Sequence, residues 1–335
     1  MVVQDLLTAY RNTPRHFQLT DRLAMPAAQV TILEGLQGSS AAFVIAAALQ
    51  EDKLSSYNHL IICNDAEEAA YFHNTLENLT QALDCFYFPS SFKNNKNFQL
   101  LNPSHVMLRT EALTRLAERS DATGGLRKKI LVSYPEAVAE KVVVPELLSS
   151  RIISIKTGAS LDVPALLLQL SEYGFDRVDF VYEPGQFALR GGIVDIYSIG
   201  NDKPYRIELF GHQVDSIRIV DPETQLSERK LSQVSIIPRI DTQTEATQQI
   251  ALLDFLPVNT LVWIQDHQFC MDRIADNQES FVHFKKMIEA QPSASTGLEE
   301  GEEKWTQSVV AEKIIGASLF SEAISKRQLI LLGRW

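Results

Sequence analysis

The feature that most constrains the fold is the order in which apolar periodicities follow one another along the chain. In the first part, short apolar runs alternate with stretches of helical spacing: the runs are 30–33, 60–63 and 130–133, and the helical stretches are 39–49, 65–79 and 104–119. Such alternation is typical of parallel sheets covered by helices. The sequence therefore predicts an α/β domain over residues 1–150.

The periodicity changes near Ile152. Asp162 is placed to cap a short helix that Gly174 ends, and strand-like pieces then follow closely, at 177–182, 193–197, 205–210 and 213–220. The segments between these pieces carry turn residues: EPGQ at 183–186, GND at 200–202 and GH at 211–212. This pattern predicts a compact antiparallel sheet with one helix.

Beyond residue 235 the chain returns to buried strands at 260–264 and 328–332. A length of 335 residues suits two or three domains. We therefore predict the first half of an α/β domain at 1–150, an inserted domain at 151–235 and the second half of the α/β domain at 236–335. The acidic segment at 291–304 has too little apolar surface to bury, which predicts a mobile loop.

Composition narrows the possible functions. The formal net charge of -11 disfavours a polyanionic partner, because nucleic-acid affinity depends largely on Lys and Arg at phosphates. The three cysteines lie far apart and form no CxxC pair, so core packing is predicted for them and no metal site. The chain contains no apolar run of membrane-spanning length and no signal-peptide pattern at its start. A cytoplasmic location is expected.

A glycine turn between a strand and a helix, ILEGLQGSSAA at 32–42, has the layout of a phosphate-binding loop. In a working GxxxxGK[ST] loop, Lys binds the β- and γ-phosphates and the hydroxyl binds magnesium. With Gly35 as the first glycine and Gly38 inside the turn, the last three essential positions fall on Ser40, Ala41 and Ala42. The sequence therefore predicts a degenerate site without ATPase activity.

A second degenerate position is predicted at Gln265, where the strand at 260–264 ends. A magnesium-binding Asp stands there in an ATPase, and a neutral amide is a poor ligand for a hard dication. The same segment also fits an ordinary buried strand that ends in polar residues.

The strand at 205–210 places Arg206, Glu208 and Phe210 on one face and three apolar residues on the other. If the apolar face is the core, an arginine and a phenylalanine stand exposed together, and both are favoured anchors of protein interfaces. Arg190 precedes the Gly191-Gly192 pair, which permits a bend or a close backbone approach. The alternative is that Arg206 and Glu208 are a solvated surface pair with a neighbouring strand and that Phe210 is a hydrophobic cover at the sheet edge.

Several spaced motifs resemble the bacterial transcription-repair coupling factors. They are YGFDRV at 173–178, EPGQFALRGGIVDIY at 183–197, PYRIELF at 204–210, VDSIR at 214–218 and DPETQ at 221–225. Weaker similarity includes EGLQGSS at 34–40 and LDFLP at 253–257.

This resemblance implies an N-terminal module similar to the first part of the excision-repair protein UvrB. Such a module is an α/β fold, a degenerate helicase-like parallel-sheet domain with a small inserted α+β antiparallel-sheet domain. In the family, the inserted domain binds UvrA through the Arg of the RGG segment and through the Arg and Phe of the PYRIELF strand. Carried over position by position, these are Arg190, Arg206 and Phe210, so the resemblance favours the interface interpretation of these side chains.

The chain departs from UvrB at the hairpin that UvrB uses to probe DNA. That hairpin is rich in aromatic residues, whereas the corresponding stretch here, PSSFKNNKNF at 89–98, has two aromatics and no Tyr. Single strands are usually gripped by stacking platforms in a positive groove, and neither is visible in the sequence. In full-length family members, RNA polymerase and double-stranded DNA are bound by other regions. The 335 residues are therefore expected to be a fragment.

Three hypotheses follow. The first, which we favour, is a non-catalytic adaptor that recruits UvrA to stalled RNA polymerase as a monomer without a cofactor. The second is an ATP-dependent UvrB-type helicase-like repair protein, which the residues Ala41, Ala42 and Gln265 disfavour. The third is a DNA-binding module, which the acidic balance disfavours.

Overall fold

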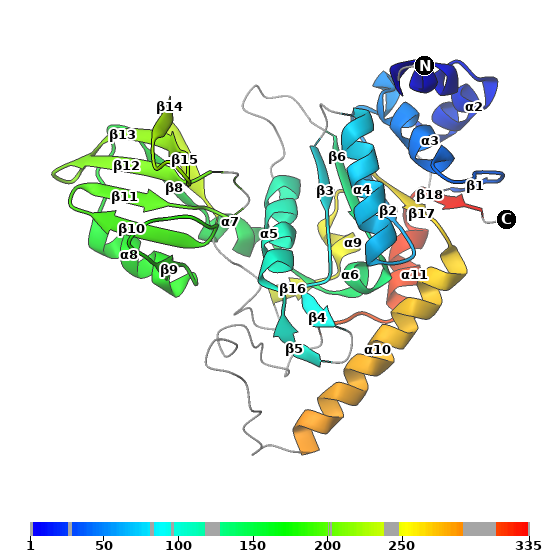
Figure 1. Ribbon diagram of the computed structural model, residues 1–335. Helices are drawn as coiled ribbons and strands as arrows, with labels where there is room; N and C mark the ends of the chain where they lie inside the picture. Colours follow the sequence, from blue (N-terminus) through cyan, green and yellow to red (C-terminus); the bar gives the residue numbers. More distant parts are fainter. Residues whose placement is uncertain are drawn as a thin grey trace. The chain divides into compact units, whose positions relative to one another are not determined.

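The computed structural model describes residues 3–25, 29–80, 84–94, 97–117, 128–199, 201, 203–237, 248–290 and 313–333. The chain divides into two compact units, which Figure 1 labels by element. The parallel-sheet unit comprises Met1–Ala112, Leu116–Val142 and Glu245–Trp335, and the inserted unit comprises Leu113–Arg115 and Val143–Thr244. The predicted loop at 291–304 lies outside the described residues.

A six-stranded sheet forms the centre of the parallel-sheet unit, and its strand order is β1-β18-β17-β2-β6-β3. All neighbouring strands in this sheet run parallel. The strands are β1 (Val30–Leu33), β2 (Asn58–Ile62), β3 (Asp84–Tyr87), β6 (Lys129–Ser133), β17 (Thr260–Ile264) and β18 (Leu329–Leu332). Because β17 and β18 lie between β1 and β2, the segments before and after the inserted unit share one sheet. This confirms the predicted α/β fold with an insertion.

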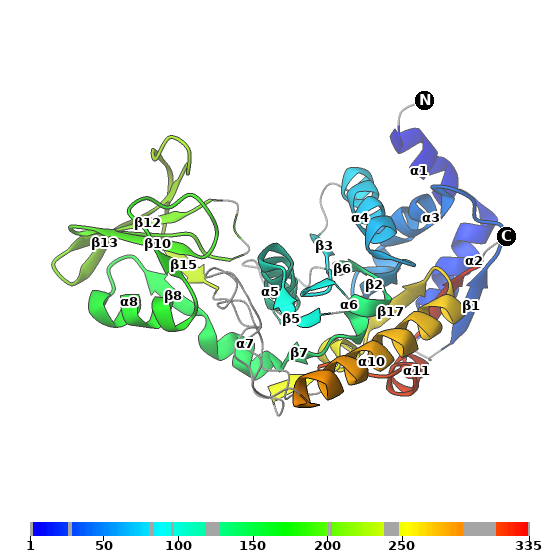
Figure 2. The same cartoon turned by 60° about the horizontal axis from the view of Figure 1, so that its bottom comes forward.

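Helices cover both faces of this sheet. In Figures 1 and 2, α3 and α4 lie on one face, while α10 and α11 lie on the other. The helices of the unit are α1 (Val3–Arg11), α2 (Pro14–Leu23), α3 (Ser40–Leu49), η1 (Asp52–Leu54), α4 (Ala66–Thr80), α5 (Pro103–Ala117), α6 (Pro135–Ala139), α9 (Leu252–Phe255), α10 (His267–Ala290) and α11 (Ala317–Ser325). Its short strands are β4 (Phe92–Asn94), β5 (Asn97–Leu101), β7 (Val142–Val143) and β16 (Gln249–Ile250).

The core under α3 and α4 contains one polar pair. Trp263 on β17 and His59 on β2 are both fully buried, and the Trp263 indole Nε1 donates to His59 Nδ1 at 3.1 Å. Burial, reinforced by the positive charge of Lys128, lowers the pKa of His59 from 6.5 to about 3. His59 is therefore neutral in the folded chain at physiological pH.

This histidine is expected to make the fold sensitive to acid. Its folded pKa is depressed, so below pH 6.5 the unfolded chain binds a proton that the folded chain refuses, and stability falls as pH falls towards about 3. At pH 5 the loss from this group is about 2 kcal/mol relative to pH 8. We expect the His59→Asn variant, whose amide oxygen can replace Nδ1 as the acceptor for Trp263, to lose this part of the pH dependence in urea unfolding at both pH values. Equal pH dependence in parent and variant would contradict the assignment.

The hairpin β4–β5 contains the two aromatic residues of the stretch at 89–98. Its two phenylalanines, Phe92 and Phe98, are buried, and their rings contact each other edge-on with centroids 5.1 Å apart. Phe98 also contacts Phe281 and Phe284 of α10, at 5.1 and 5.7 Å. These rings belong to the core, so they offer no stacking platform for bases without leaving it.

The inserted unit is built on a second six-stranded sheet with the order β14-β13-β12-β11-β10-β9. The pairs from β10 to β14 are antiparallel, as the close succession of strands and turns predicts. Its elements are α7 (Pro145–Arg151), β8 (Ile153–Lys156), α8 (Val163–Glu172), β9 (Asp176–Arg177), β10 (Gln186–Arg190), β11 (Ile193–Ile196), β12 (Tyr205–Phe210), β13 (Gln213–Val220), β14 (Ser227–Leu231) and β15 (Gln233–Ile236).

Local sequence explains α8, the longer of the two helices named for this unit. The Asp162 side chain accepts from the Ala165 N–H at 3.1 Å and caps α8, and Leu166 and Leu170 on its inner face are buried. Gly174, with φ of 78°, follows the helix in the left-handed conformation that ends many helices. At the ends of the unit, β8 pairs antiparallel with β15, which brings the entering and leaving chains together as an insertion requires.

The strand prediction for this unit omitted β8, β10, β14 and β15, and it is wrong at 177–182. Residues 177–182 were expected to form a strand, but only β9 (Asp176–Arg177) does, while β10 begins at Gln186 inside the predicted turn. Val178 and Val181 instead pack on Ala188 and Tyr197 across the sheet face. The Gln186 side chain accepts from the N–H groups of Tyr182 and Glu183. These hydrogen bonds replace the backbone bonds that would join this segment to a neighbouring strand.

Candidate functional site

The candidate site is the face of the inserted sheet that carries Arg190, Arg206 and Phe210. The register pairs Arg206 with Asp195 on β11 and with Arg218 on β13, and it pairs Arg190 with Ile193. Since directly paired residues point to the same face, the two arginines and Asp195 form one group.

Asp195 joins the two arginines. The Nε and Nη2 atoms of Arg206 donate to the two carboxylate oxygens at 2.8 and 2.9 Å, which is a bidentate pair. Arg190 Nη2 makes a second ion pair with the same carboxylate. The hydrogen bond to Asp195 raises the pKa of Arg206. Asp195 is only 2% exposed, so its charge depends on these two partners.

Each arginine has a further contact that fixes its guanidinium. Arg206 Nη1 donates to the Gln225 carbonyl at 3.1 Å, and Gln225 has a φ of 59°, the only positive value among the described non-glycine residues. The Arg190 guanidinium carbon lies 4.5 Å from the centre of the Phe180 ring, a cation–π geometry.

Two turns bring Arg190 and Phe210 to the same end of the sheet. Gly191, with φ of 60°, turns the chain between β10 and β11, and a Cβ on Gly192 would lie 3.2 Å from the Leu209 carbonyl oxygen. The Gly191-Gly192 pair therefore provides both the bend and the close approach expected from the sequence. A bulge in the β12–β13 pairing falls between Glu208 and Leu209, just before Phe210.

The three predicted side chains differ in exposure. Phe210 is 83% exposed, whereas the side chains of Arg190 and Arg206 are 30% and 14% exposed. The expectation that Arg206 stands in the open beside Phe210 is thus wrong, because Asp195 draws it onto the sheet. The alternative, in which Arg206 and Glu208 pair with a neighbouring strand, is met in part: Glu208 accepts from Ser216 at 2.5 Å and lies 3.5 Å from Arg218, both on β13. The low exposure of Arg206 does not fit the solvated part of that alternative.

Sequence reasoning missed Asp195, Phe180 and Gln225 as parts of this site. For Asp195 a signal existed, since it is the one charged residue in the apolar run Ile193-Val194-Asp195-Ile196. Phe180 and Gln225 reach the arginines only through the tertiary fold, so no local pattern marks them.

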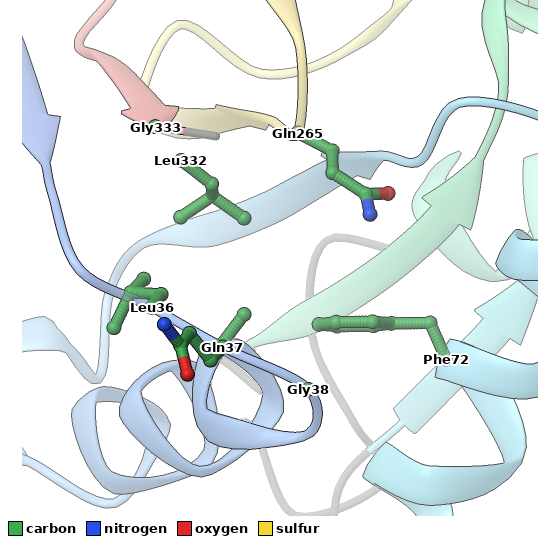
Figure 3. A pocket seen from close by; sticks show the side chains of 8 residues that line it. Leu36, Gln37, Gly38, Phe72, Gln265, Leu332 and Gly333 are labelled. Atoms are coloured by element: carbon green, nitrogen blue, oxygen red, sulfur yellow. The ribbon is translucent and has the colours of Figure 1, made fainter. Parts of the chain in front are cut away.

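The glycine turn before α3 borders a pocket of about 370 Å³, lined by Leu36, Gln37, Gly38, Ala41, Phe72, Gln265, Leu332 and Gly333. Figure 3 shows Gln265 reaching into it from the sheet, across from Leu36 and Gln37 of the turn. The structure thus brings together Gly38, Ala41 and Gln265 of the predicted degenerate site, with Gly35 and Gly38 at positive φ.

The chemistry of this pocket is mostly apolar. Ser40 is the first residue of α3, and Ala42 is buried in the core. Serine and alanine carry no charge, so neither position can supply a charged side chain. Among the described residues, those that line the pocket include no lysine and no carboxylate. A site that binds and activates a nucleotide needs positive charge and a metal ligand at these places.

The remaining candidate groups do not form a reactive centre. The described residues contain no cluster of metal-binding side chains. The cysteines are unpaired, and burial raises the pKa of Cys270 and of Cys85 to about 12 and also raises the pKa of Cys63. Thiols with raised pKa values are poor nucleophiles. No helix in the described part of the chain is long and apolar enough to cross a bilayer.

Comparison with known proteins gives a family for the unit that carries the arginines. Residues 153–241 match the model of the UvrB interaction domain. The chain is a UvrB-like relative of the transcription-repair-coupling factors. The factor of Staphylococcus haemolyticus is 30% identical over 240 residues, that of Staphylococcus aureus (strain Mu50) 29% over 237, and that of Bacillus subtilis 28% over 208.

These matches cover 71%, 70% and 62% of this chain, but only 19%, 19% and 17% of the respective relatives. The chain thus spans about a fifth of the length of the transcription-repair-coupling factors it matches. The UvrB interaction domain covers β8 to β15, and therefore all the residues of the Arg190–Asp195–Arg206 group.

Proposed function

We propose that the chain is a non-catalytic adaptor of transcription-coupled repair, which recruits UvrA to sites of stalled RNA polymerase. The observation that carries this proposal is the group of Arg190, Arg206 and Phe210 on one face of the UvrB interaction domain. An exposed aromatic ring beside ordered arginines is the composition of a protein-binding hot spot.

The pocket at the glycine turn supports the non-catalytic part of the proposal. Phosphoryl transfer relies on positive charge placed around the phosphates and on a bound metal ion. Ala41 and Gln265, which the loop pattern assigns to the lysine and magnesium-ligand positions, both line this pocket. A helicase-like activity driven by ATP is therefore the less favoured alternative.

Calorimetric titration of the purified chain into UvrA tests both parts at once. We expect saturable binding with a single stoichiometry. We also expect the same affinity whether or not magnesium and ATP are added to the chain before mixing, after correction for the effect of ATP on UvrA alone. Absence of binding by the folded chain would contradict the adaptor function. ATP turnover by the chain alone, or a rise in its unfolding temperature on adding ATP, would favour the helicase-like alternative.

A further inference from the structure

A buried carboxylate lies beneath the two arginines of the candidate site. Asp195 is on β11 between apolar residues, and an unpaired charge there would cost several kcal/mol. Its oxygens accept from Nε and Nη2 of Arg206, and its Oδ2 also pairs with Nη2 of Arg190. One carboxylate thus sets the direction of two guanidinium groups on two different strands.

The other contacts of the arginines complete this arrangement. Gln225 accepts from Arg206 through its carbonyl, and its side chain donates to the carbonyls of Val181 and Pro222 at 3.2 and 2.7 Å. A residue held at positive φ by several bonds is a strained feature that often accompanies a functional site. Arg206 is therefore fixed at three nitrogens, and it keeps one N–H on each terminal nitrogen for a partner.

Fixing a long side chain before binding removes part of the entropy cost of association. We infer that Asp195 is a positioning residue of the UvrA-binding surface, which holds Arg190 and Arg206 in the conformation that the partner meets. This inference rests on the proposed function. It adds that the binding strength of the surface depends on a residue that the partner does not touch.

The test is the Asp195→Asn substitution, which keeps the shape of the side chain and removes its charge. We expect UvrA to bind at least about 10-fold more weakly, because both arginines must then be ordered during association. Glu228→Gln is the control: it changes the net charge equally in the same unit, and Glu228 forms its ion pair with Lys203 and with neither arginine. The control is expected to bind like the parent.

A merely structural role is separated by combining substitutions. In a chain that already carries Arg190→Gln and Arg206→Gln, Asp195→Asn is expected to change affinity by less than about 2-fold, since the groups it acts through are gone. In a Phe210→Ala chain it is expected to keep its full effect. If Asp195→Asn weakened binding as much in the chain without the two arginines as in the parent, the inference would be overturned.

A measurement on the unmodified chain covers the case in which Asp195→Asn fails to fold. The Arg206 Nε–H, which donates to Asp195, is expected to exchange with water far more slowly than that of the exposed Arg229, as followed by side-chain NMR. Equally fast exchange would overturn the inference. The two proposals fail differently: a parent that does not bind UvrA refutes the function, whereas a parent and an Asp195→Asn chain that bind alike refute only the positioning role.

Discussion

Truncation of Phe210 to alanine is expected to weaken UvrA binding by about 30-fold or more, which corresponds to about 2 kcal/mol. The reason is the placement of the ring. It is 83% exposed at the end of β12, and the β12–β13 turn and the preceding bulge fix the backbone that carries it. Burying such a ring gains apolar area at a low entropy cost. The measurement is the calorimetric titration of the variant into UvrA.

The same substitution is expected to leave the unfolding temperature almost unchanged, because an exposed ring contributes little to the core. Tyr71→Ala provides the matched control: Tyr71 is 79% exposed, but it lies on α4 in the parallel-sheet unit. Parent-like affinity is expected for this control. Equal losses in the two variants would show that the binding surface is not centred on Phe210.

The broad architecture could be predicted because periodicity reports burial directly. The segments at 39–49 and 65–79 became α3 and α4 almost to the residue, since each apolar helical stretch follows a short apolar run that forms a strand. The strand prediction for residues 177–182 failed for a physical reason. Val178 and Val181 pack on Ala188 and Tyr197, and the Gln186 side chain accepts from backbone N–H groups that a strand would pair. The pattern of a single sequence shows how apolar residues are spaced. It does not show which group forms a hydrogen bond with a given backbone N–H.

Three side chains of the candidate site could be named from the sequence, but their contacts and the residues that hold them could not. Alternation along β12 marked Arg206 and Phe210, and the glycine pair marked Arg190. The pairing of Arg206 with Asp195 depends on the register of β11 against β12, which the sequence does not specify. For this reason the arginine was expected in the open, whereas the carboxylate opposite it holds it half-buried.

A second large effect is expected in the parallel-sheet unit, where a buried ion pair supports the hairpin β4–β5. Arg109 on α5 is fully buried, its Nη1 lies 3.6 Å from Glu140 Oε2, and its guanidinium lies 4.2 Å from the centre of the Phe88 ring. Glu140 in turn accepts from the Ser91 N–H at 2.9 Å and from the Ser90 hydroxyl at 3.1 Å, at the start of the hairpin.

The Arg109→Met substitution is expected to lower the free energy of unfolding by about 3–5 kcal/mol, because it leaves the Glu140 charge buried without its cation. Urea unfolding at neutral pH measures this loss. Lys326→Met is the control: it also removes the cation of an ion pair, but Lys326 and Glu322 are both about two-thirds exposed, so no measurable change is expected. An equally small effect at Arg109 would show that the Glu140 carboxylate is satisfied by the two serines alone, and that the arginine only fills space beneath the hairpin.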